Sequence, residues 1–329
     1  MLIKTTLIIL AVFVVIFGVI AGIDIYKSKQ KSGYVEKFNK KVSISAYLML
    51  TPAVILAFIF IMLPILFSLG YAFTDYYLLE PDATKFVFLD NFQYILEEIS
   101  YKGDLFHAIR NTALFVVCVV PLQIGLALLL ALFCNRKIKG VGIFKICFFA
   151  PVVISLSVTS YLWLHILSPS ETGLLNSILG LFGKEPVDVL RNPKTAILWI
   201  VLLSAWQGCG FQMLIFLSAL SNIREDIYEA ASLDGANRFK KFLYVTIPSL
   251  KPTFLYVVIT VFIGACRIMV QPMIMVGYQS HVVTISYYMY QQGYAYKWVG
   301  LSSSVALLMT IIIGTITILQ RKFLGEKEW

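Results

Sequence analysis

The sequence contains few charged residues. Asp, Glu, Lys and Arg make up only 14% of its 329 residues, whereas 59% are hydrophobic, and the mean hydropathy is +0.82. A water-soluble domain cannot bury this much apolar surface and still present a polar exterior to water. The composition therefore excludes an ordinary soluble domain and predicts a membrane protein.

Cysteine and histidine are also scarce. None of the five cysteines forms a C-x-x-C pair, and each lies within an apolar segment or at its end. This pattern argues against a disulfide scaffold or a zinc site and is typical of small hydrophobic core residues. The three histidines are scattered (His107, His165 and His281). We expect no metal and no cofactor.

The sequence lacks the signatures of an enzyme. Residues 180–185 are the segment most similar to a phosphate-binding loop, but they lack the G-x-x-x-x-G-K-S/T spacing and a preceding strand. No nucleophile stands beside a base in a recognisable arrangement. A membrane-embedded enzyme is therefore not favoured, and any ATP hydrolysis is expected to take place in another chain.

Long hydrophobic runs are abundant. About 20 apolar residues in a helix cross the ~30 Å hydrocarbon core of a bilayer, and only helices or closed barrels satisfy their backbone groups there. The sequence predicts an all-α, polytopic membrane protein with seven spans: 5–25, 47–73, 112–133, 146–167, 195–220, 253–276 and 300–320.

The formal charge of +9 is explained by topology. With the first helix entering from outside, most of the 27 Lys and Arg fall in cytosolic segments, while residues 75–104, which are rich in acidic side chains, lie outside. This distribution follows the positive-inside rule. We expect a multi-pass protein of the plasma membrane with its N-terminus outside, its C-terminus in the cytosol and no nucleic-acid partner.

The first apolar run has two interpretations. It could be a signal peptide, but residues 7–23 exceed the usual apolar core of such a peptide, no A-x-A site closes the run, and lysines follow it. A retained anchor is favoured. The predicted organisation is an extra transmembrane helix with a basic linker over 1–45, followed by a six-helix transmembrane domain over 46–329.

Two short helices are expected between the spans. Residues 90–96 begin with Asp90 and have an amphipathic pattern. Residues 174–182 form an apolar segment closed by Gly183.

The most informative segment is the polar loop 221–252 between two spans. Asn222 can cap a helix over 224–233, Gly235 allows a tight turn, and a second helix over 237–246 would end at Pro248. Pro252 would then lie at the entry of the next span. Two helices joined by a turn form a lever that can transmit motion; the alternative is a merely solvated amphipathic loop.

This loop resembles the signature loop of permease subunits of ATP-driven (ABC) importers, which docks on a separate ATPase. The residues that carry the resemblance run from Glu229-Ala230-Ala231 through Asp234-Gly235-Ala236 to Phe242, Ile247-Pro248 and Pro252. Residues 47–53, 88–92, 173–176 and 206–214 are also similar to sugar permeases of the maltose type, and 90–92 make the chain look like the larger of the two maltose subunits. The resemblance covers about residues 45–322.

The resemblance implies a transmembrane permease subunit of a binding-protein-dependent importer, with a carbohydrate as substrate. It further implies a second homologous permease, a cytosolic ABC ATPase dimer and an extracytoplasmic solute-binding protein as partners, in a membrane-lipid environment. The residues expected to couple to the ATPase are Glu229, Ala230, Ala231, Asp234, Gly235, Ile247 and Pro248.

Polar residues inside the spans indicate a substrate path, because such side chains face a cavity or another helix. The candidates are Ser155, Ser204, Gln207, Phe211, Gln212, Arg267 and Gln271. Gln271 is expected one turn beyond Arg267 on the same helix face. By resemblance, the faces around Gly208, Gly264, Ala265 and Ile268 line the same cavity.

Arg267 has two interpretations. It could face the cavity, which would favour an acidic sugar as substrate, or it could form an ion pair with a neighbouring subunit. The outer tyrosines Tyr287, Tyr288, Tyr290, Tyr294 and Tyr296 could likewise guide a sugar or contact an external binding protein, or they could form an interfacial aromatic belt.

Two other functions remain. One is the import of a non-sugar solute, such as a phosphorylated polyol. The other is a secondary transporter driven by an ion gradient, but the paired acids or broken helices that this would need in mid-membrane are expected to be almost absent from the spans.

Overall fold

The computed structural model describes residues 48–136, 139–192, 195–277 and 282–324. Within these ranges the chain is helical, and its only β-pairing consists of two isolated bridges, Thr74 with Phe86 and Tyr77 with Trp298. The all-α prediction is confirmed. The predicted N-terminal helix and its basic linker lie outside the described residues.

Five helices in the described ranges are long and apolar enough to span a membrane. They agree with five of the predicted spans within a few residues at most ends, except that α5 begins eight residues early. They are Leu48–Tyr71, which ends in α3 (Leu63–Tyr71), α5 (Asp104–Cys134), α9 (Ala196–Ser221), Lys251–Met275, which contains α13 (Lys251–Cys266) and α14 (Val270–Met275), and α16 (Val299–Leu324).

The predicted continuous span over 146–167 is wrong. It is divided into α6 (Val141–Val153) and α7 (Leu156–Ile166), which meet at an angle of 100°. Both residues of the break, Ile154 and Ser155, have extended ψ angles near 136°. Hydropathy cannot reveal such a break, because apolar residues continue through it.

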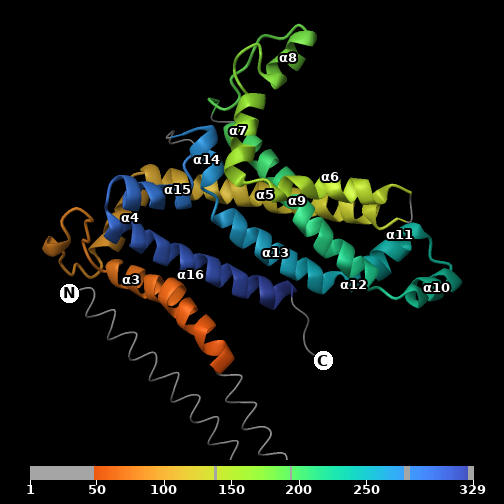
Figure 1. The fold of residues 1–329 in the computed structure, drawn as a ribbon, viewed down its shortest axis with the longest axis horizontal. Coiled ribbons are helices and arrows are strands. Elements are labelled where there is room, and N and C mark those ends of the chain that lie inside the picture. Colours follow the sequence, from red (N-terminus) through yellow and green to blue (C-terminus); the bar gives the residue numbers. More distant parts are fainter. Residues whose placement is uncertain (1–47, 137–138, 193–194, 278–281, 325–329) are drawn as a thin grey trace, which may run out of the picture.

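The span over 253–276 is also interrupted, so the expectation that broken helices are almost absent from the spans is wrong. α13 ends at Cys266 and α14 begins at Val270, so Arg267 lies in the break. The expectation that Arg267 and Gln271 share one face of a continuous helix is therefore wrong. α14 packs against α7, which brings the two broken spans together (Figure 1).

α5 and α9 form the central pair of the bundle, with α6 and α13 packed against them. Small residues permit close approach here, as in many membrane helices. A Cβ atom at Gly210 of α9 would lie 2.3 Å from the carbonyl oxygen of Phe148 of α6. The buried residues common to this pair include Ala127, Ala131, Met213 and Phe216.

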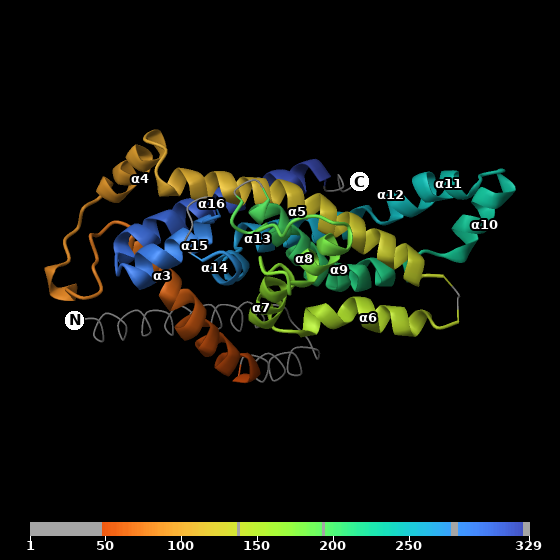
Figure 2. The same ribbon diagram turned by 90° about the horizontal axis from the view of Figure 1, so that it is seen from above.

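Shorter helices lie at the ends of the bundle. The predicted helix over 90–96 is present and longer, as α4 (Asp90–Ser100), and the predicted helix over 174–182 is α8 (Leu174–Leu181), followed by Gly183 with a φ of 69°. α15 (Ile285–Tyr290) continues into a π-helix, η4 (Gln291–Ala295). Figure 2 shows α4 and α15 at the opposite end of the molecule from α10 and α11.

The polar loop forms a chain of short helices. They are α10 (Glu225–Leu233), α11 (Arg238–Lys241), the π-helix η3 (Phe242–Thr246) and α12 (Ile247–Ser249). Two details of the prediction are wrong: Asn222 ends α9 and does not cap α10, whose N-cap is Arg224, and Pro248 lies in the first turn of α12 and does not end the helix. The placement of Pro252 in the first turn of α13 is confirmed.

Candidate functional site

A cavity of about 940 Å³ lies between the two broken spans. Residues of α5, α9, α13, α14, α15, η4 and α16 line it, together with residues that flank the α6–α7 break and residues of the Arg267–Met269 break. Most of the lining is apolar, and the polar groups are amides, hydroxyls and one guanidinium. Predominantly apolar cavities with a few convergent polar groups are typical of small-molecule sites.

Five of the seven predicted path residues line this cavity: Ser204, Gln207, Gln212, Arg267 and Gln271. Ser155 does not, because it is exposed in the α6–α7 break, where its carbonyl oxygen accepts the amide of Thr159 at 3.0 Å. Phe211 also lies outside the lining and is 50% exposed. The cavity ends on α9 at Gln212, and Phe211 stays on the open surface. The roles of these residues in transport remain predictions.

Gln207 compensates the break between α6 and α7. Its Nε2 donates a hydrogen bond to the carbonyl oxygen of Ile154 at 3.1 Å, and its Oε1 accepts one from Oγ1 of Thr159 at 3.1 Å. A backbone carbonyl freed by a helix break in a membrane needs such a partner. Gln207 thus holds both sides of the break while it lines the cavity.

The side-chain amides of Gln123 and Gln212 form a hydrogen-bonded pair beside Gly208. Nε2 of Gln123 on α5 donates to Oε1 of Gln212 on α9 at 3.1 Å, and both side chains are buried. A Cβ atom at Gly208 would lie 2.3 Å from Nε2 of Gln123. The glycine therefore makes room for this pair.

The α13–α14 break has its own hydrogen-bond partners. Oγ1 of Thr284 donates to the carbonyl oxygen of Ile268 at 2.7 Å, and Oγ of Ser286 donates to that of Cys266 at 3.4 Å. Across the cavity, Nε2 of Gln271 donates to Oγ of Ser204 at 3.3 Å. These bonds fix the backbone on both sides of Arg267.

Arg267 is exposed within the cavity lining. Among the described residues, no Asp, Glu or Lys and no second Arg lines the cavity. The guanidinium is the single charged group that the described part of the chain contributes to this lining.

Two tyrosines extend the lining on η4 and the end of α15. The rings of Tyr290 and Tyr294 stack with centroids 5.1 Å apart, and both residues line the cavity. Nζ of Lys297 lies 4.8 Å from the centroid of the Tyr294 ring. Tyr287 and Tyr288 are instead buried in the core, and Oη of Tyr288 donates to Glu98 at 2.9 Å. The sequence did not separate these two groups of tyrosines.

Several lining residues were not identified from the sequence. They are Gln123, Thr260, Ser286, Ser302 and Thr310. Gln123 could have been found, because it is an amide in the middle of an apolar run. The predicted lining positions Gly208, Gly264, Ala265 and Ile268 do border the cavity.

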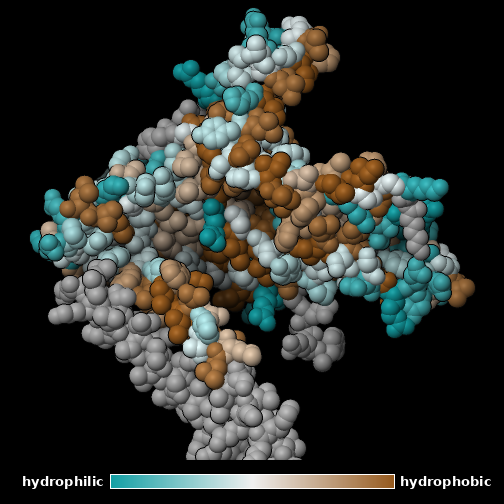
Figure 3. Space-filling view, in the orientation of Figure 1, coloured by the Kyte–Doolittle hydropathy of each residue, from teal (hydrophilic) through white to brown (hydrophobic). Residues whose placement is uncertain are grey.

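The polar loop follows the C-terminal end of α9. Figure 3 shows hydrophilic side chains gathered at the right end of the molecule, where α10 and α11 lie, and hydrophobic side chains over the helices beside it. α10 has no buried residue, and Leu233 at its end is 90% exposed. Glu229, Ala230, Asp234, Gly235 and Pro248 are exposed, while Ala231 and Ile247 are half-buried.

The turn after α10 is a Schellman motif. The amide of Ala236 donates to the carbonyl oxygen of Ala231 at 2.9 Å, and that of Gly235 donates to Ser232 at 3.0 Å. Gly235 has a φ of 75°, the left-handed conformation that this motif requires and that glycine adopts without strain. The sequence-based interpretation of Gly235 as a tight turn is confirmed.

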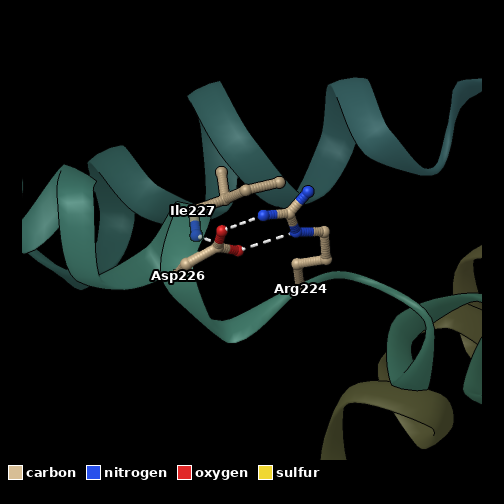
Figure 4. A network of polar contacts seen from close by, with 3 residues as sticks. All are labelled: Arg224, Asp226 and Ile227. Atoms are coloured by element: carbon tan, nitrogen blue, oxygen red, sulfur yellow. Dashed lines mark hydrogen bonds and ion pairs between the residues drawn. The ribbon is translucent and has the colours of Figure 1, made fainter.

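Side chains fix the two arms of the loop. The hydroxyls of Tyr228 on α10 and Thr246 on η3 hydrogen bond at 2.9 Å, and Nζ of Lys241 donates to Oγ of Ser232. Asn237 caps α11 by accepting the amide of Lys240 at 2.8 Å. At the start of α10, Arg224 forms an ion pair with Asp226 (Figure 4). These contacts hold α10 against α11 and η3.

Comparisons with known proteins cover most of the chain. A model of the family described as "Binding-protein-dependent transport system inner membrane component" matches residues 115–327. The chain is 31% identical over 301 residues to the arabinooligosaccharides transport system permease protein AraP of Bacillus subtilis (strain 168), covering 90% of this chain and 93% of AraP. It is 30% identical over 288 residues to the sn-glycerol-3-phosphate transport system permease protein UgpA of Agrobacterium fabrum (strain C58 / ATCC 33970), covering 85% and 94%.

A solved structure shares the fold. A chain in the crystal structure of a bacterial ABC transporter involved in the import of the acidic polysaccharide alginate superposes with a TM-score of 0.75. The alignment covers 87% of this chain and 96% of that chain, at 22% sequence identity.

Proposed function

The chain belongs to the family of binding-protein-dependent transport system inner membrane components, and from this premise we propose that it forms part of the pathway of an ATP-driven carbohydrate importer. In this role it is a translocation subunit. Hydrolysis of ATP takes place in a separate cytosolic ATPase dimer.

One observation carries the proposal: the polar loop joins α9 and α13, two helices that line the cavity. α9, which carries Ser204, Gln207 and Gln212, leads into α10, and α12 leads into α13, which ends at Cys266 directly before Arg267. A partner that moves α10 therefore moves two cavity walls together. α10 has no buried residue, and its small residues Ala230, which is exposed, and Ala231, which is half-buried, suit close contact with an ATPase surface.

The proposed assembly contains three kinds of partner. A second, homologous permease completes the transmembrane pathway, two copies of the ATPase bind the loops, and an extracytoplasmic binding protein delivers the substrate. The family description supports the binding protein, since it names binding-protein-dependent transport. We place the N-terminus outside and the C-terminus in the cytosol, on the distribution of Lys and Arg.

The substrate class is inferred from the relatives and the lining. AraP is named for arabinooligosaccharide transport, and the cavity combines amide and hydroxyl groups with the rings of Tyr290 and Tyr294. Such groups suit the hydroxyls and the apolar ring faces of a sugar. A phosphorylated polyol is the second candidate, because UgpA is named for sn-glycerol 3-phosphate transport.

The test is mild-detergent affinity purification of the chain from its native membranes, followed by mass spectrometry of the co-purified proteins. We expect a second permease and an ATPase. The Gly235→Pro variant should insert normally but lose the ATPase or uncouple it from uptake, because proline cannot adopt the φ of 75° and lacks the amide that bonds to Ser232.

A matched control is Gly180→Ala in α8, where an added Cβ would meet no atom within 4 Å. This variant should retain the partners and the uptake. A chain that purifies alone and transports after reconstitution would instead identify a secondary transporter and refute the proposal.

A further inference from the structure

We propose that Arg267 binds an anionic group of the transported substrate, a carboxylate or a phosphate carried on a polyhydroxylated molecule. The inference rests on the proposed import function and concerns the same cavity. The inference concerns the charge of the substrate, which neither the loop nor the fold determines.

The placement of Arg267 supports this assignment. The residue lies in the break between α13 and α14, where the span is interrupted, and it borders the cavity. Its backbone is held on both sides by the hydrogen bonds of Thr284 to Ile268 and of Ser286 to Cys266. A guanidinium on a fixed backbone can present its donors in a defined direction.

The lack of a counter-charge gives the second argument. A charged side chain within a membrane span is costly unless an opposite charge or water compensates it. The described lining contains no carboxylate, so the guanidinium has no counter-ion among the described lining residues. A substrate anion that enters the cavity would supply one.

Geometry distinguishes Arg267 from the neutral polar groups nearby. Gln207, Gln123 and Gln212 are engaged in hydrogen bonds with other parts of the protein. Arg267 offers five N–H donors in a planar fork, which matches the two oxygens of a carboxylate or phosphate. Charge-assisted bonds of this type are about twice as strong as those between neutral groups.

The tyrosines extend the same site toward a second cation. Tyr290 and Tyr294 line the cavity together with Arg267, and Nζ of Lys297 lies 4.8 Å from the Tyr294 ring. The stacked rings offer apolar surface for a sugar ring. An anionic sugar bound against these rings would have Arg267 in the same lining and Lys297 beside the Tyr294 ring.

The experiment uses the complete transporter, purified from native membranes with its companion subunits and binding protein and reconstituted in proteoliposomes. The probes are trisaccharides of galacturonate, glucuronate and mannuronate, each paired with its carboxyl-reduced neutral counterpart, and sn-glycerol 3-phosphate paired with glycerol. ATP-driven uptake is measured for wild type, Arg267→Gln and Arg267→Lys. Arg110→Gln is the matched control, because Arg110 is exposed on α5 outside the cavity lining.

We expect uptake of at least one anionic probe in preference to its neutral counterpart. Arg267→Gln should lower that uptake about 10- to 100-fold, the effect of losing one hydrogen bond to a charged group, and Arg267→Lys should fall between. Arg110→Gln should match the wild type. Uptake of sn-glycerol 3-phosphate alone, with the same dependence on Arg267, would support the inference but contradict the carbohydrate substrate.

Three outcomes would overturn the inference. The first is uptake of a neutral carbohydrate with no preference for its anionic partner, which leaves the proposed function standing. The second is loss of the second permease from the purified Arg267→Gln complex, which would assign Arg267 to an ion pair between subunits. The third is a complex that hydrolyses ATP but imports no carbohydrate or polyol, in which case the proposed function fails as well.

Discussion

Nε2 of Gln207, in the middle of α9, donates a hydrogen bond to the carbonyl oxygen of Ile154 across the break between α6 and α7. The two residues are 53 positions apart in the chain. Because Oε1 of Gln207 also accepts a bond from Thr159, one carboxamide holds the end of α6 and the first turn of α7. α9 also leads directly into the loop that is proposed to bind the ATPase, so Gln207 links the helix that leads into this loop to the broken span.

Replacement of Gln207 by leucine should destabilise the protein. The change removes the side-chain donor to the carbonyl oxygen of Ile154, at a cost of about 1 kcal/mol, while the hydroxyl of Thr159 keeps its bond to the carbonyl oxygen of Leu156 at 3.0 Å. The readout is the thermal unfolding midpoint of the purified complex. Gln93→Leu on α4 is the control, because Gln93 is exposed and should have little effect. An unchanged midpoint with a raised KM for uptake would show that Gln207 is only a substrate contact.

Gly208→Ala should disturb the amide pair between α5 and α9. The added Cβ would lie 2.3 Å from Nε2 of Gln123, so the Gln123 side chain must move and lose its bond to Gln212, at a cost of about 1 kcal/mol. Unfolding of the variant measures this effect. Gly125→Ala on α5 has no atom within 4 Å of its added Cβ and should be neutral or slightly stabilising. Equal midpoints for the two variants would contradict the proposed role of Gly208.

The spans and the loop were predictable because their signals are local. Hydropathy over about 20 residues located α5, α9 and α16, and glycine preference identified the left-handed turn at Gly235. Asn237 was also expected at the start of the second loop helix, where it now caps α11. Each of these features depends on residues close together in the chain.

The two helix breaks were not predictable, because the side chains that donate hydrogen bonds to the freed carbonyl oxygens are distant in sequence. The carbonyl of Ile154 is satisfied from α9, and that of Ile268 from Thr284 beyond α14. In the span over 146–167 apolar residues lie on both sides of Ser155, and in the span over 253–276 Arg267 is the single charged residue. Periodicity alone therefore predicts a continuous helix in each span. The same reason explains the placement of Ser155, which a straight helix would have kept in a helical turn.

Thr284→Val should loosen the break that positions Arg267. Valine has nearly the shape of threonine but cannot donate to the carbonyl oxygen of Ile268, which now accepts the Thr284 hydroxyl at 2.7 Å. Because Thr284 is buried, we expect a loss of about 1–3 kcal/mol in the free energy of unfolding. Chemical or thermal denaturation of the complex measures it.

The control for this variant is Thr310→Val. The Thr310 hydroxyl bonds to the carbonyl of Ala306 within α16, and that carbonyl can also accept the helix's own amide, so the stability should change by less than about 0.5 kcal/mol. If Thr284→Val is as stable as Thr310→Val, the hydroxyl of Thr284 does not hold the break.

Gly235→Ala should weaken coupling between ATP hydrolysis and uptake. An L-residue in the left-handed conformation costs about 1–2 kcal/mol, and Gly235 has a φ of 75° within the Schellman motif that ends α10. The strain falls on the turn between α10 and α11, far from the cavity, so binding of substrate should be unaffected. ATPase activity and uptake measured on the same proteoliposomes give the number of ATP molecules hydrolysed per substrate, which should rise.

The Gly235→Asn variant distinguishes the effect of backbone strain from the effect of an added side chain. Asparagine tolerates the left-handed conformation better than alanine, so Gly235→Asn should retain more coupling than Gly235→Ala despite its larger side chain. Space does not limit either variant, because a Cβ at this position meets no atom within 4 Å. If alanine and asparagine reduce coupling equally, the absence of a side chain at Gly235 matters for contact with the ATPase, and the backbone conformation is not the cause.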